Sequence, residues 1–335
     1  LVSREGRGQP LRAESQKTCL TPGDPNSFGP TPGPWLQRFG RERQRVSPLL
    51  GRSPCHRADD CLPPEPAGWC ALSSRLRNAF TLVEVLVSCA IIGTLLALLL
   101  PAVQKVRAAA MRLQCLNNLK QMGIACHHYQ LDFGTLPPGG IEWRPPGNTT
   151  NRQLAWSAFL LPYIEQDGIH RRVDFRQPFD SPGNAPAAAQ VIKVYLCPNS
   201  RRVEPTVDGR GGIDYGGIFG ERITGPNQPP KGVMIYDQVF ALADIYDGTC
   251  YTLMISEDSG FPDGQWINGR NIFDQAFAIN KAPKWENDIR SDHGGGANGL
   301  FADGSARFLR ETMPLPILAA ICTRARCEPI LYDDF

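Results

Sequence analysis

The residues best suited to chemistry lie in one segment near the C-terminal end, residues 291–308. His293 precedes three consecutive glycines, and Asp303-Gly304 separates two short apolar runs. An imidazole with nearby carboxylate oxygens could hold a cation, so His293 and Asp303 are candidate metal ligands. A structural role is favoured instead, because no second His or Cys is spaced nearby for a metal site. Asp-Gly is also a typical hairpin turn, so we expect paired strands at 299–302 and 307–309, with no metal and no cofactor bound.

Motifs that mark common enzyme active sites are missing from this sequence. It contains no G-x-S-x-G, P-loop, H-E-x-x-H or paired C-x-x-C. Glu257-Asp258 is interpreted most simply as the polar end of a strand, and His127-His128 would point about 100° apart on a helix. We therefore expect no enzymatic activity.

The longest apolar stretch covers residues 80–103 and contains one charged residue, Glu84. The stretch is long enough to cross about 30 Å of hydrocarbon, and an acid inside it is costly unless the acid finds a partner. Beyond Pro101, apolar residues recur at steps of three and four as far as Phe133, and Gly134 follows as a stop signal. The spacing predicts a single helix over residues 80–134, with its first half in a membrane.

Residues 1–79 are rich in Pro and Gly and carry an excess of Lys and Arg, which predicts a disordered basic leader. Basic residues just before the apolar stretch, Arg75 and Arg77, favour a cytoplasmic location for that end and an outside location for the C-terminal domain. The whole chain has a formal net charge of only +2, which indicates no nucleic-acid partner. No methionine precedes Met111, so we expect translation to start upstream or at a non-ATG codon, and part of residues 1–79 to be a mis-assigned start.

Residues 135–335 alternate short apolar runs with clusters of Gly, Pro, Asn and Asp, a pattern typical of antiparallel strands. The expected strands cover residues 191–196, 233–236, 251–256, 299–302 and 307–309, and a helix is expected over 156–166. The predicted fold class is therefore α+β, with the long helix packed on an antiparallel sheet domain. Tryptophans in loop-like contexts are the residues that form sugar platforms, although core packing explains them equally well. They are Trp143, Trp156, Trp266 and Trp285.

Residues 77–86 resemble the type IV prepilin signal, a basic leader followed by Phe-Thr-Leu-x-Glu, although Ala79 stands where that family usually has Gly. The resemblance implies that a prepilin peptidase cuts between Ala79 and Phe80 and that the new amine is methylated. It also implies that Glu84 pairs with the N-terminal amine of a neighbouring subunit. Pro101 corresponds to the kinking proline of pilin helices.

Further motifs resemble the prepilin-type family of domain of unknown function (DUF) 1559. They are the helical Cys-x-Asn-Asn-Leu-Lys-Gln motif, which contains Cys115, Asn117 and Asn118, and the motif of His293 followed after nine residues by Asp303-Gly304. This resemblance implies a pilin-like fold and export. Because Cys197 also belongs to a family motif and export permits oxidation, Cys115 and Cys197 are expected to approach one another as a candidate disulfide pair.

These observations predict a pilin-like or pseudopilin-like structural or surface protein of the type II secretion and type IV pilus kind. It is expected to be a single-pass protein of the cytoplasmic membrane, with membrane lipid, the prepilin peptidase and like subunits in a filament as partners. The alternative is an exported solute-binding or glycan-binding module tethered by one helix.

Overall fold

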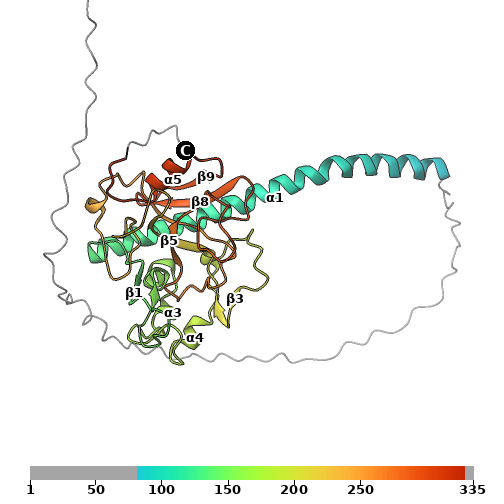
Figure 1. The fold of residues 1–335 in the computed structure, drawn as a ribbon. Coiled ribbons are helices and arrows are strands. Elements are labelled where there is room, and N and C mark those ends of the chain that lie inside the picture. Colours follow the sequence, from blue (N-terminus) through green and yellow to red (C-terminus); the bar gives the residue numbers. More distant parts are fainter. Residues whose placement is uncertain (1–80, 329–335) are drawn as a thin grey trace, which may run out of the picture. The chain divides into compact units, whose positions relative to one another are not determined.

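A single long helix begins the part of the chain that this computed structural model describes, residues 81–328. Helix α1 runs from Leu82 to Phe133 over 52 residues and contains Pro101 (Figure 1). The helix expected over residues 80–134 is confirmed from Leu82 to Phe133. Proline has no amide hydrogen, so one hydrogen bond of the helix is missing at Pro101. The expected leader over residues 1–79 and the processing residues Ala79 and Phe80 lie outside the described residues.

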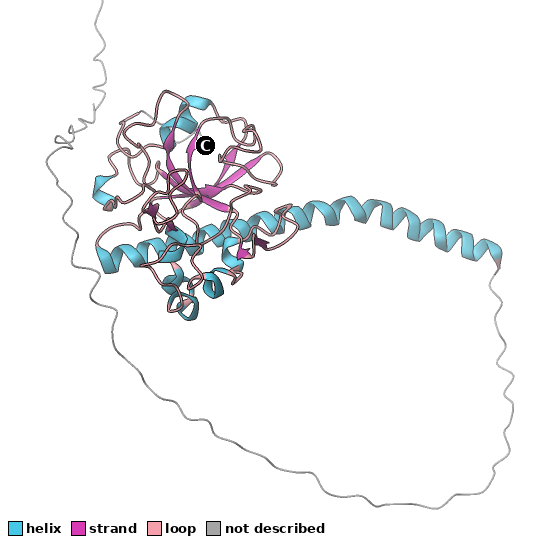
Figure 2. Cartoon of the chain, turned by 60° about the horizontal axis from the view of Figure 1, so that its bottom comes forward, coloured by secondary structure: helices cyan, strands magenta, loops and turns pink. Residues whose placement is uncertain are grey.

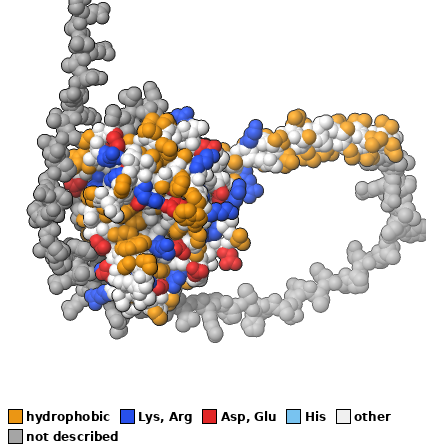
Figure 3. Space-filling view, in the orientation of Figure 1, with side chains coloured by type: hydrophobic (Ala, Val, Ile, Leu, Met, Phe, Trp, Pro, Cys, Tyr) orange, Lys and Arg blue, Asp and Glu red, His pale blue; other side chains and the backbone are white. Residues whose placement is uncertain are grey.

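The chain divides into two compact units inside α1, between Ile92 and Gly93. The described part of the first unit is the beginning of the helix, and the second unit contains the rest of α1 and every later element. All residues from 81 to 110 are exposed. This part of α1 is long and apolar enough to cross a membrane, with a mean hydropathy of 2.5 over its most apolar 18-residue window. Figure 3 shows apolar side chains along it.

Five strands form the main sheet of the second unit, in the order β7-β5-β6-β8-β9. Their bounds are β5 Tyr215–Glu221, β6 Leu253–Glu257, β7 Ile272–Gln275, β8 Gly296–Phe301 and β9 Ala306–Arg310. The pairs within β5-β6-β8-β9 are antiparallel, and β5 with β7 is parallel. The sheet is drawn in magenta in Figure 2. The α+β fold class, a long helix with a mostly antiparallel sheet, is therefore confirmed.

Helices cover both faces of this sheet. Neighbouring residues of a strand point to opposite faces, so Leu300 of β8 packs in the cluster that contains Leu119 and Met122 of α1. Phe301 packs in the cluster on the other face, which contains Leu318 of α5 (Leu315–Ile321). The second half of α1 is thus held by apolar burial against one face of the sheet, along which Figures 1 and 2 show it lying.

The remaining elements are short. They are β1 Gly140–Ile141, β2 Leu154–Ala155, α2 Trp156–Phe159, η3 Leu161–Ile164, α3 Asp167–His170, α4 Ala185–Ala188, η4 Lys193–Tyr195, β3 Thr206–Val207, β4 Arg210–Gly211 and η5 Leu242–Asp244, where η marks a 3-10 helix. β1 pairs with β2 and β3 pairs with β4, each as an antiparallel ladder of two residues.

Two of the expected strands and the expected second helix differ from the structure. Residues 191–196 contain the helical turn η4, because a short apolar run does not distinguish a strand from a helical turn. Residues 233–236 lie beside β5, with the Met234 amide donating to the Ile218 carbonyl at 3.0 Å, but form no strand. The helix expected over 156–166 is broken into α2 and η3, and Glu165 ends η3 with a φ of 61°.

The hairpin expected around Asp303-Gly304 is confirmed. β8 and β9 pair in the register Leu300 to Ala306. The Gly304 amide donates to the Phe301 carbonyl at 2.9 Å, and Gly304 has a φ of 77° whereas Asp303 has no positive φ. The connection is therefore a turn that ends in one left-handed glycine, not a turn with two left-handed central residues.

Candidate functional site

Four side chains that are far apart in the sequence meet in the buried space between α1 and the sheet. Cys115 comes from the middle of α1, Cys197 follows η4, Glu257 ends β6, and His293 precedes β8. Their two sulfurs, one carboxylate oxygen and one imidazole nitrogen all lie within 4.8 Å of one another, and all four residues are buried. We call these residues the thiol–histidine cluster.

The distances inside this cluster are short. His293 Nε2 lies 3.4 Å from Cys197 Sγ and 3.4 Å from Glu257 Oε1. Cys197 Sγ lies 3.9 Å from Glu257 Oε1. The sulfur atoms of Cys115 and Cys197 lie within 4.8 Å of each other, and both residues are free thiols. Two potential thiolates, an imidazole and a carboxylate therefore face one common point.

The charges of the cluster are coupled. Burial alone would lower the pKa of His293, but the hydrogen bonds to Cys197 and Glu257 and the charge of Glu257 raise that pKa to about 9. Burial would raise the pKa of Glu257, yet hydrogen bonds from His293 and Asn298 hold it below its usual range. The contact with Cys115, together with burial, raises the pKa of the Cys197 thiol. Without a ligand, His293 and Glu257 thus form an ion pair beside the protonated Cys197 thiol.

Neighbouring polar groups hold Glu257 and Cys197 in place. The backbone amide and the side-chain amide of Asn298 both donate to the Glu257 carboxylate, at 2.8 and 2.9 Å. The Cys197 amide donates to the buried carboxylate of Asp214 at 3.0 Å. Asn118, one turn of helix after Cys115, donates to the Leu196 carbonyl at 3.1 Å and so ties the Cys197 segment to α1. The geometry of the cluster is therefore supported from outside it.

The residues of the two sequence motifs have separate positions. His293 is in the cluster, whereas Asp303 is not: its carboxylate accepts the Ser305 amide at 2.8 Å in the hairpin turn. Gly304 contacts α1 instead, since its carbonyl accepts Lys120 Nζ at 2.7 Å. Asn118 is buried and Asn117 is exposed. The structure brings Cys115 and Cys197 together as thiols, and a disulfide between them stays a prediction.

Sequence reasoning missed Glu257 as a member of a site. Its position at the end of a strand was expected, but its side chain is fully buried. Because 36 residues separate it from His293 and 60 from Cys197, no local spacing connects the three. One signal was available, since Glu257 lies two residues after the apolar run Leu253-Met254-Ile255, and a carboxylate is costly to bury without a partner.

At the other end of α1, Thr81 and Glu84 form a reciprocal cap. The Thr81 amide and hydroxyl donate to Glu84 Oε2 at 2.9 and 2.8 Å, and the Glu84 amide faces Thr81 Oγ1 at 3.3 Å. This is the capping-box arrangement, which satisfies backbone donors at the start of a helix. Glu84 therefore has a local structural role at the N-terminus of the described helix.

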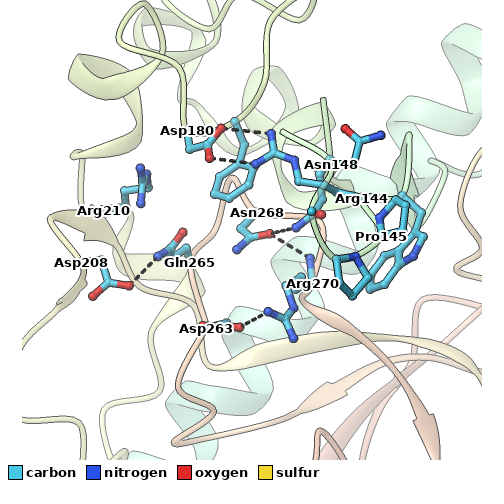
Figure 4. Close-up of a pocket in the computed structure, with 15 residues that line it drawn as sticks. Arg144, Pro145, Asn148, Asp180, Asp208, Arg210, Asp263, Gln265, Asn268 and Arg270 are labelled. Atoms are coloured by element: carbon cyan, nitrogen blue, oxygen red, sulfur yellow. Dashed lines mark hydrogen bonds and ion pairs between the residues drawn. The ribbon is translucent and has the colours of Figure 1, made fainter. Parts of the chain in front are cut away.

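Of the four tryptophans considered for a sugar platform, two reach the surface. Trp156 and Trp266 are fully buried, and Trp285 is exposed. Trp143 lines a surface pocket of about 470 Å³, shown in Figure 4. The charged groups of this pocket already pair with each other, as in the ion pairs Arg144 to Asp180 at 2.8 Å and Arg270 to Asp263 at 2.7 Å, so the pocket does not favour the binding-module alternative.

A helix that is exposed and apolar at its beginning and packed on a mostly antiparallel sheet at its end defines a type IV pilin-like protein. In agreement with this class, the prokaryotic N-terminal methylation motif matches residues 74–100. The family described as "Protein of unknown function (DUF1559)" matches residues 104–271 and 265–315, and the chain belongs to this family. The methylation motif implies processing by prepilin peptidase, pilin-like assembly and a single-pass membrane anchor. Searches of curated proteins and of solved structures return no match.

Proposed function

We propose that this protein is a structural subunit of a pilin-like or pseudopilin-like assembly, cleaved between Ala79 and Phe80 and held with its C-terminal domain outside the cytoplasmic membrane. The observation that carries the proposal is the methylation motif over residues 74–100, which ends in the exposed apolar part of α1. Basic residues before the apolar stretch, Arg75 and Arg77, support the orientation.

The exposed part of α1 needs cover from outside the chain. Every residue from 81 to 110 is exposed, and large apolar side chains such as Leu82 and Leu98 are about three-quarters exposed, at 75% and 74%. Contiguous apolar surface of this kind marks a membrane or protein contact. Lipid would cover it in the single subunit, and the same part of neighbouring subunits would cover it in an assembly.

Substitutions of Glu84 can distinguish assembly of subunits from simple anchoring in the membrane. It is the one charge between Leu82 and Val103, and cleavage before Phe80 would create a cationic amine close to it on every subunit. An ion pair between subunits would be strong where water is excluded. The capping box with Thr81 is a second role for the same carboxylate, and the two roles can be separated.

Three variants separate them in cells that express the full chain. Glu84→Gln keeps a capping-box side chain but removes the charge, Glu84→Ala removes both, and Thr81→Ala removes the cap alone. All three are expected in the membrane fraction. The two Glu84 variants lose an acid that costs about 2–3 kcal/mol in hydrocarbon, and Thr81→Ala leaves the apolar stretch intact. Crosslinking between subunits should fall in both Glu84 variants and persist in Thr81→Ala. Wild-type crosslinking of Glu84→Gln would contradict the charge pair.

The N-terminus of membrane-extracted protein tests the processing step. Mass spectrometry should find a chain that starts at a methylated Phe80, leaving 256 of the 335 residues (335 − 79). Ala79→Gly restores the residue usual at this position and should increase the processed fraction. A mature terminus near Ala110 would contradict the proposal, since it would indicate ordinary signal-peptide cleavage.

A further inference from the structure

We propose that the thiol–histidine cluster, Cys115, Cys197, Glu257 and His293, binds one Zn²⁺ ion. The ligand types are those that zinc takes in proteins, namely thiolate sulfur, imidazole nitrogen and carboxylate oxygen. Thiolates with imidazole select zinc over the hard cations calcium and magnesium, which require oxygen ligands. The inference is independent of assembly, because all four residues follow the exposed part of α1, residues 81–110.

The distances fit a tetrahedral ion. Zinc–sulfur bonds of about 2.3 Å and zinc–nitrogen or zinc–oxygen bonds of about 2.0–2.1 Å place ligand atoms roughly 3.3–3.8 Å apart at tetrahedral angles. In the cluster, His293 Nε2 lies 3.4 Å from both Cys197 Sγ and Glu257 Oε1, and Cys197 Sγ lies 3.9 Å from Glu257 Oε1. The fourth ligand atom, Cys115 Sγ, lies within 4.8 Å of the other three. A small closure of the set would complete the tetrahedron.

The groups around the cluster are arranged as metal sites require. Outer hydrogen bonds that orient first-shell ligands are typical of such sites. Asn298 holds the Glu257 carboxylate with two donors, and Asp214 holds the Cys197 backbone. The cluster is also shielded from solvent, since each of its four residues is at most 5% exposed. Water therefore competes little with these side chains for the ion.

Four protein ligands leave no open position, so the ion would be structural and not catalytic. Cys115 belongs to α1, whereas Glu257 and His293 belong to the sheet end of the domain. Zinc would thus fasten the helix that carries the membrane anchor to the domain that it supports. In this arrangement His293 acts as a ligand, and the Asp303-Gly304 end of the same motif packs the hairpin on α1.

A disulfide between Cys115 and Cys197 is the competing state of the same sulfurs. The two sulfurs lie within 4.8 Å of each other, and their oxidation to a disulfide would remove two of the four ligands. The two states exclude each other in any one molecule. The state of the protein as extracted from membranes, without added metal or reductant, therefore decides between them.

The test uses the full chain in detergent. Zinc content is measured by mass spectrometry on the extracted protein, and the chelator-stripped protein is then titrated with Zn²⁺ while its melting temperature is followed. Wild type should contain about one zinc per chain and should melt higher with Zn²⁺. Cys115→Ser and His293→Gln should lose both effects, and Asn298→Ala should bind roughly tenfold more weakly.

Cys126→Ser is the matched control. Cys126 is also a buried free thiol on α1, and burial raises its pKa to about 12, but it lies outside the cluster. This variant should bind Zn²⁺ as wild type does. Zinc-free wild type that gains no stability from Zn²⁺ would overturn the proposal. So would wild-type binding by folded Cys115→Ser and His293→Gln, or a Cys115–Cys197 disulfide in the extracted protein.

A measurement on wild type alone covers the case in which a ligand variant does not fold. Co²⁺ replaces zinc in tetrahedral sites and absorbs differently from hexahydrated Co²⁺, with sulfur-to-metal charge-transfer bands when thiolates bind it. Stripped wild type titrated with Co²⁺ should develop those bands and lose them on addition of Zn²⁺. A spectrum that remains that of hydrated Co²⁺ would overturn the proposal.

Discussion

The two parts of α1 differ in what covers their apolar residues. Leu98 is 74% exposed in the first part, whereas Leu119 is fully buried in the second, although both are leucines of one continuous helix. The second part alternates its buried positions with exposed polar ones such as Asn117 and Lys120, whereas residues 85–100 of the first part are almost wholly apolar. A one-sided apolar face is covered by the chain itself, and an all-round apolar surface requires lipid or another subunit.

The largest expected difference between the two parts comes from the same leucine substitution in each. Leu119→Ala removes a fully buried side chain from the core between α1 and the sheet and should lower the free energy of unfolding by about 2–5 kcal/mol. Leu98→Ala should change it by less than about 0.5 kcal/mol. Thermal melts of both full-chain variants in detergent measure the difference. Equal losses would mean that the first part of α1 also packs on the domain.

Two glycines sharpen the same comparison at a smaller scale. A Cβ on Gly123 would lie 2.8 Å from Leu300 Cδ1 and 3.4 Å from the Gly304 backbone, whereas a Cβ on Gly93 would meet nothing within 4 Å. Overpacking costs about 1–3 kcal/mol, and the better helix propensity of alanine offsets about 1 kcal/mol of it. Gly123→Ala should therefore destabilise the domain moderately.

Gly93→Ala is the control for this effect, because it gains helix propensity without a contact. Domain melting should be unchanged or slightly higher in this variant. Destabilisation of similar size in both variants would indicate that the close approach of α1 to the β8–β9 hairpin is not the reason for a glycine at position 123.

The helix and the hairpin were predictable from the sequence because their signals are local. The continuous apolar stretch up to residue 103, the apolar periodicity beyond Pro101 and the Asp303-Gly304 turn each depend on neighbours a few residues apart. Strand β5 was not recognised, because Tyr215-Gly216-Gly217 contains two residues that strands usually avoid. In the structure these glycines permit close packing, since a Cβ on Gly216 would lie 2.5 Å from the Phe273 ring.

The thiol–histidine cluster was only partly predictable. The proximity of Cys115 and Cys197 was expected from the family resemblance, and His293 was a candidate ligand on its residue type. Glu257 and the meeting of all four residues depend on how β6 and the loop before β8 reach α1, which no spacing along the chain encodes. Asp303 was interpreted together with His293 because the two are close in sequence, yet the hairpin separates them.

The smallest effect is expected where α1 contacts the hairpin through a single charged side chain. Lys120 Nζ donates to the Gly304 carbonyl at 2.7 Å. Lys120→Met keeps the apolar stem but removes this donor, and water can reach the carbonyl afterwards, so the cost should be about 1 kcal/mol. Lys105→Met makes the same change in the exposed part of α1 and should leave the melting temperature of the domain unchanged. A loss for Lys120→Met alone would show that the polar contacts of α1 with the domain are also confined to its second part. Equal losses would place both lysines in contact with the domain and would contradict the division of the helix into an exposed and a packed part.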